Sequence, residues 1–163
     1  MESLRHWSDP PLKWDTIKVF SKRARPLEIF IENKSKYTLE LKEDFLFSGE
    51  RVDSTFKKSI VPESSWLTLV ANKPPGLSVG GGLMYKLQQT KCILYIGFSN
   101  PCVGGHKSFV CLSDVEHTAK WAYEEAKDGF FKSCSFEEKY RVIAETAAAK
   151  YCPSQRIVFT VNG

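Results

Sequence analysis

From Leu27 to Val161 the sequence alternates apolar and polar residues with a period of two, which is the period of a β-strand. Turn-forming residues such as those at 33–35 and 74–76 separate the alternating runs from one another. The runs that this pattern predicts as strands are residues 27–32, 37–41, 44–48, 59–62, 65–71, 78–87, 92–98, 107–112, 140–145 and 156–161. Many short strands at this spacing predict a mainly β, single-domain sandwich or barrel rather than alternating strand and helix units.

Two segments break the alternation and predict two short helices that flank the β-sandwich. One covers residues 114–127, where Ser113 or Asp114 caps the helix and the Asp-Gly pair at 128–129 ends it. Trp121 and Tyr123 are two residues apart on this helix, so we expect one ring to face the sheet and the other to be free. The second, looser helix is expected within residues 11–24.

The first 26 residues form a basic amphipathic segment, distinct from the sandwich domain expected at 27–163. Its apolar residues recur at helical spacing, which suits either a helix lying in a membrane interface or a surface helix docked on the core. A helix over residues 11–24 would be about 21 Å long. That is shorter than the hydrocarbon core of about 30 Å, which favours interfacial binding over spanning. The candidate membrane-interface residues are Trp7, Trp14, Ile17 and Phe20.

Charge, apolar runs and cysteine count limit which classes of function are expected. A net charge of +4 over 163 residues is too weak to indicate a nucleic-acid partner. No run approaches the roughly 20 continuous apolar residues of a spanning helix, and the first residues lack the apolar core of a signal peptide. Since the first segment is amphipathic, we expect a membrane-associated protein, and composition leaves open whether its soluble form is secreted or cytoplasmic. Five cysteines, an odd number without framework spacing, favour free thiols or at most one or two bridges.

Catalytic and cofactor motifs are weak in this sequence. Cys102, His106, Cys111 and His117 have zinc-ligand chemistry, but they lack the close Cys-x2-Cys pair, so loop and core residues are the favoured interpretation. No local motif supports a Cys–His nucleophile, and the glycines at 80–82 do not lead into a phosphate-binding helix. The sequence therefore predicts a binding protein without a cofactor or metal, and not an enzyme.

Two stretches close together in the sequence are the most informative for function. Residues 92–101, CILYIGFSNP, form an apolar strand that ends on a polar turn. Residues 76–85, GLSVGGGLMY, are so poor in side chains that another backbone or a ligand can approach closely. Together with FSG at 47–49 and AYEE at 122–125, they resemble the headgroup-binding half of an actinoporin. The resemblance runs from about residue 15 to 161 in the same element order, as in a divergent member of the actinoporin-like family.

The resemblance implies a phosphocholine pocket on one exposed concavity, lined by Ser48, Gly80, Ser99, Pro101 and Tyr123. Aromatic rings bind a quaternary ammonium by cation–π attraction, serine hydroxyls donate to phosphate, and Lys107 adds positive charge. The implied protein is a pore-forming cytolysin that binds phosphatidylcholine or sphingomyelin and oligomerises on the membrane. Fungal fruit-body lectins have a similar sandwich, so a non-lytic lipid- or glycan-binding module is the alternative.

Overall fold

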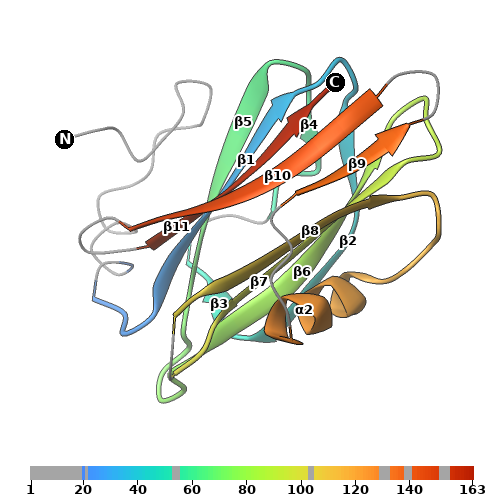
Figure 1. The fold of residues 1–163 in the computed structure, drawn as a ribbon. Coiled ribbons are helices and arrows are strands. Elements are labelled where there is room, and N and C mark those ends of the chain that lie inside the picture. Colours follow the sequence, from blue (N-terminus) through green and yellow to red (C-terminus); the bar gives the residue numbers. More distant parts are fainter. Residues whose placement is uncertain are drawn as a thin grey trace.

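Two β-sheets pack face to face in the computed structural model, which describes residues 20, 22–52, 56–102, 105–128, 133–137, 141–150 and 155–163 (Figure 1). The first sheet contains, in spatial order, β3 (Glu50–Arg51), β5 (Ser64–Ala71), β1 (Pro26–Lys34), β11 (Gln155–Asn162), β10 (Arg141–Lys150) and β9 (Ser133–Glu137). The second sheet contains β4 (Ser59–Ile60), β2 (Leu39–Ser48), β6 (Val79–Leu87), β7 (Ile93–Asn100) and β8 (Lys107–Ser113). Helix α2 (Ala119–Asp128) packs on the second sheet. The predicted β-sandwich is confirmed.

The main core lies between the two sheets and follows the period-two pattern of the sequence. Leu27, Ile29 and Ile31 point inward from β1, and Leu83 and Leu87 meet them from β6. All of these side chains are buried in one cluster. Inward residues alternate with residues that lie on the outer faces, as expected for two sheets packed face to face.

The first and last strands pair in parallel, whereas the other strand pairs that the structure describes are antiparallel. The register of β1 and β11 runs from Leu27 opposite Gln155 to Lys34 opposite Asn162. On the outer face of this pair, the Glu28 carboxylate lies 2.8 Å from the Arg156 guanidinium. The ion pair is buried, so the two ends of the sandwich domain are joined by a contact that strand patterning does not predict.

The boundaries of several elements differ from the sequence-based prediction. The runs 37–41 and 44–48 form one strand, β2, which continues through an irregularity between Leu41 and Glu43. Strand β9 was not predicted, because its sequence SCSFE is short and weakly apolar. Of the residues predicted to form the N-terminal helix, Phe20 is helical, whereas residues 22–24 form a turn and bends, so the prediction extended too far at this end. The rest of that prediction, like most of the 1–26 segment, lies outside the described residues.

Helix α2 begins five residues later than the prediction at 114. Thr118 is the N-cap, because its hydroxyl accepts the hydrogen bond of the Trp121 backbone N–H at 3.0 Å. Residues 115–117 are instead held over the sheet by Tyr95. The Tyr95 hydroxyl accepts from the His117 backbone N–H at 2.7 Å and donates to the Val115 carbonyl at 3.1 Å.

A second apolar cluster lies on the outer face of the first sheet, away from the inter-sheet core. Phe20 is buried there against Phe30, Leu67, Leu69 and Ala71. Among the described residues, no helix has both the length and the apolar character needed to cross a bilayer.

Candidate functional site

Four residues from four neighbouring strands form a row across the second sheet. Gly80 of β6 is opposite Ser48 of β2 on one side and Ser99 of β7 on the other, and Ser99 is opposite Lys107 of β8. Directly opposed residues in antiparallel strands project to the same face of the sheet. A Cβ atom built on Gly80 would lie 2.5 Å from Cε1 of Tyr123, so this row faces α2 on the outer side.

Phe47 forms the outermost part of this site. Its ring stacks on Tyr123, with ring centroids 5.0 Å apart and an interplanar angle of 16°. Phe47 is 62% exposed, whereas Tyr123 is only 7% exposed. Since one face of the Phe47 ring rests on Tyr123, the opposite face is turned to solvent. The accessible aromatic surface of the site is therefore that of Phe47.

A β-bulge brings Phe47 to this position. Leu46 is opposite Gly81 and Ser48 is opposite Gly80, so Phe47 is the extra residue of β2 without a partner on β6. Strict alternation would place Phe47 in the core when Ser48 faces outward. The bulge lets both Phe47 and Ser48 lie on the outer face.

Two glycines allow α2 to lie very close to the sheet and so fix the position of Tyr123. A Cβ on Gly82 would be 1.9 Å from the Ala119 carbonyl oxygen, and a Cβ on Gly97 would be 2.0 Å from that of Ala122. Only residues without a side chain fit at such a distance from a backbone. The expectation of close approach at the Gly-rich strand is confirmed for Gly82, and the approaching group is the helix.

Because the helix lies so close, both of its large rings reach the sheet. Trp121 makes edge contacts with Tyr95 and Phe109 at centroid distances of 5.2 and 5.3 Å. Tyr123 contacts Gly80 and Phe47 on the other side of the alanine stripe of the helix. The expectation that one of these two rings is free was wrong. The helix lies so close to the sheet that large side chains on both sides of its alanine stripe, Trp121 and Tyr123, reach the strands.

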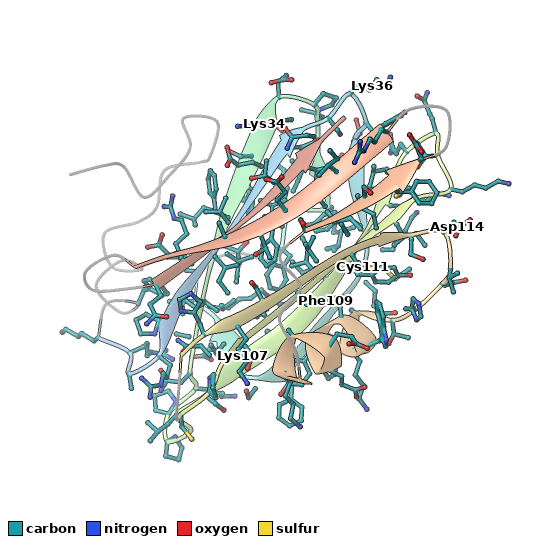
Figure 2. The ribbon with its side chains drawn as sticks, in the orientation of Figure 1. Lys34, Lys36, Lys107, Phe109, Cys111 and Asp114 are labelled. Atoms are coloured by element: carbon teal, nitrogen blue, oxygen red, sulfur yellow. The ribbon has the colours of Figure 1, made fainter. Side chains whose placement is uncertain are left out.

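Polar groups lie on the same face as the aromatic pair, at this end of the sheet. The Ser78 hydroxyl lies 3.2 Å from that of Ser48. The Lys107 ammonium donates to the Lys127 carbonyl at the end of α2, with a separation of 3.2 Å; Figure 2 shows Lys107 on the part of β8 that lies near this helix. Hydroxyl donors beside an exposed ring, with the Lys107 ammonium on the same face three strands away, are suited to a ligand that carries a phosphate and a cation together.

The structure brings together four of the five residues predicted to bind a headgroup. Ser48, Gly80 and Ser99 are aligned and Tyr123 covers Gly80, whereas Pro101 directly follows β7 and is half-buried. Ser99 is itself buried, so Ser48 and Lys107 are the more accessible polar groups. The headgroup-binding role of these residues stays a prediction.

Of the predicted membrane-interface residues, only Phe20 is described, and it lies away from this site. Phe20 is buried on the outer face of the first sheet, while Trp7, Trp14 and Ile17 lie outside the described residues. Sequence reasoning gave no role to Phe47 or Ser78. Phe47 belongs to the FSG motif, but the motif alone does not reveal the bulge that exposes the ring.

The four zinc-type residues do not gather around one point. His117 stacks on Trp121 with centroids 3.8 Å apart, and His106 hydrogen-bonds Gln155. Cys111 is on β8, and the carbonyl of the exposed Cys102 accepts from Arg25 at 2.5 Å. Within the described residues, no group of three or more His, Cys, Asp or Glu side chains is arranged to hold a metal ion.

Comparison with known proteins adds one relevant finding. No family model matches this chain, and no curated protein sequence matches it significantly. Among solved structures, the crystal structure of the lipid binding protein Nakanori is similar, with a TM-score of 0.72 and 10% sequence identity. The match covers 91% of this chain and 77% of that one. At this identity the comparison shows that the chain has the fold of Nakanori.

Proposed function

We propose that this chain is a membrane-lipid-binding protein that recognises the phosphocholine headgroup at the Ser48–Gly80–Ser99–Lys107 row. In this proposal the phosphate accepts hydrogen bonds from Ser48 and Ser78 and is attracted by Lys107. The quaternary ammonium lies on the exposed face of Phe47. The residues that supply these groups come from β2, β8 and the loop before β6.

The observation that carries the proposal is the stack of Phe47 on Tyr123 beside the serine row. An exposed aromatic ring normally gains by packing inward, yet Phe47 is held outward on a bulge with 62% of its surface in contact with solvent. An aromatic face binds a quaternary ammonium by about 0.5–2 kcal/mol. Nakanori, whose fold this chain shares, is a lipid binding protein, and this supports the same class of ligand here.

Pore formation and oligomerisation on the membrane are the further steps of the proposal. They require the N-terminal segment to leave the sandwich. Phe20 packs outside the sandwich on Phe30, Leu67 and Leu69, so releasing it would leave the inter-sheet core intact. The released segment would enter the bilayer interface with Trp7, Trp14 and Ile17.

The test is co-flotation with vesicles of phosphatidylcholine or sphingomyelin, against vesicles of phosphatidylethanolamine, which lacks the quaternary methyl groups. We expect binding to the first two, competition by soluble phosphocholine, and a loss of about 1 kcal/mol in Phe47→Ala. Val115→Ala is the matched control, since Val115 is 58% exposed but precedes α2 at a different site. Equal binding to both headgroup classes would refute phosphocholine recognition.

Dye release from the same vesicles tests the pore step separately. Leakage that is lost on deletion of residues 1–19, with binding retained, is the expected result, since this deletion keeps Arg23 and Arg25 on Asn72. Binding without leakage would leave a non-lytic lipid-binding module.

A further inference from the structure

Leu77 is an exposed apolar side chain on a loop that the rest of the molecule holds firmly. It is 55% exposed and lies in the connection between β5 and β6. The Asn72 side-chain amide donates to the Gly76 carbonyl at 2.8 Å, and the Gly76 N–H donates to the Lys73 carbonyl at 2.9 Å. These bonds order the loop on both sides of its Pro-Pro pair without burying Leu77.

A second segment pins the base of this loop. The Arg25 backbone N–H donates to the Asn72 side-chain oxygen at 2.8 Å, and the Arg23 guanidinium donates to the Asn72 carbonyl at 2.6 Å. Asn72 is 3% exposed. The loop is therefore pre-organised, and its exposed leucine needs no further ordering before it meets a partner.

The loop lies next to the proposed headgroup site. Ser78, which follows Leu77, contacts Ser48 at 3.2 Å, and Ser48 follows Phe47. Phe47 and Leu77 are two of four large apolar side chains in the described part of the chain that are more than half exposed, together with Val61 and Val115. The connection from β5 to β6 and the start of β8 lie at the same end of the sandwich (Figure 1).

Two exposed lysines belong to the loop of Leu77 and to the segment that holds it. Lys73 is exposed in the same loop, and Lys22 is exposed beside Arg23. The nearby acid Glu50 is neutralised by an ion pair with Arg23 at 2.8 Å. A protruding apolar residue with a basic surround matches the interface of a bilayer that contains anionic lipid, where the leucine enters the acyl region and the lysines stay among the headgroups.

We propose that Leu77 is a membrane anchor that enters the bilayer and, with Lys73, gives the protein a preference for anionic lipid, fixing this end of the sandwich against the membrane. This inference rests on the proposed lipid-binding function and adds a second contact outside the headgroup site. It also sets the orientation, because Lys34 and Lys36 then lie at the end that faces away from the membrane (Figure 2).

The experiment compares Leu77→Ser with Val61→Ser in co-flotation with phosphatidylcholine vesicles. Val61 has a similar exposure, 54%, but lies near Glu63, which bonds Asn33 at the opposite end of β1. We expect Leu77→Ser to bind roughly ten-fold more weakly, from the lost transfer of a leucine side chain, and Val61→Ser to bind like the unmodified chain. Both changes are on the surface, and thermal unfolding checks that both variants stay folded.

Mixed vesicles of phosphatidylcholine and phosphatidylserine test the charge preference. The unmodified chain should bind them more tightly than phosphatidylcholine alone, and Lys73→Gln should reduce that gain by roughly five-fold at low salt. Equal binding of Leu77→Ser and Val61→Ser, while the unmodified chain floats, would overturn the anchor and leave the headgroup site standing; it would point to a protein partner for Leu77. No flotation of the unmodified chain with either vesicle would overturn the proposed function itself.

Discussion

Replacing Gly97 by alanine should displace α2 from the second sheet. The new Cβ would lie 2.0 Å from the Ala122 carbonyl oxygen, 2.7 Å from the Ala122 carbonyl carbon and 2.9 Å from the Ala126 Cβ. Ordinary contact begins at 3.4 Å, so the helix must retreat by about 1.4 Å. Two of the three obstructing atoms belong to the helix backbone, which cannot avoid the methyl group by a change of rotamer.

The cost follows from what the helix buries. Ala119, Ala122 and Ala126 are fully buried against the sheet, and Trp121 packs on Tyr95 and Phe109 from the same helix. Adding one methyl group to a filled contact costs about 1–3 kcal/mol, and a backbone clash belongs at the upper end of that range. We therefore expect Gly97→Ala to lower the free energy of unfolding by about 2–3 kcal/mol.

Urea unfolding followed by tryptophan fluorescence measures this change, since Trp121 lies in the affected contact. Gly105→Ala is the matched control, because a Cβ at Gly105 meets no atom within 4 Å and the change should be neutral or slightly stabilising. Gly82→Ala should resemble Gly97→Ala, and the double variant should cost less than the sum, because both methyl groups push the same helix. If Gly97→Ala unfolds at the same urea concentration as Gly105→Ala, the close-contact reasoning is wrong.

Three further predictions concern stability and thiol reactivity. Glu28→Gln should lower the free energy of unfolding, measured by urea titration, by about 3–5 kcal/mol, because it removes the carboxylate charge that the buried Arg156 guanidinium faces. Lys120→Gln is the control in the exposed Lys120–Glu124 pair and should change this free energy by less than about 0.5 kcal/mol. Iodoacetamide followed by peptide mapping at pH 8 should modify the exposed Cys102 well before Cys134, since burial raises the pKa of the Cys134 thiol to about 12. The urea midpoint should fall as pH rises above about 8.5, the pKa of an unfolded cysteine. The reason is that the native Cys134 thiol keeps a proton that the unfolded chain releases. Cys134→Ala should make this fall shallower.

The period-two pattern by itself determined the layers of this protein. Leu27, Ile29 and Ile31 alternate with polar or exposed-face positions, and an extended backbone sends such residues to opposite sides whatever their partners are. The lack of side chains in the glycine-rich strand likewise indicated close approach by another backbone or a ligand, without identifying which. These properties depend on residues that are near one another in the sequence.

The tertiary structure alone decided the pairing of strands and the composition of the site. Glu28 and Arg156 are 128 residues apart, and only the parallel pairing of β1 with β11 makes them neighbours. The bulge that turns Phe47 outward exists because β2 and β6 settle in a particular register, a choice made by all their facing side chains together. Tyr95 of β7 similarly delays the start of α2, because its hydroxyl hydrogen-bonds the backbone of residues 115 and 117. Local periodicity fixes which face a residue takes, whereas the neighbours on that face come from contacts that form only when the whole chain has folded.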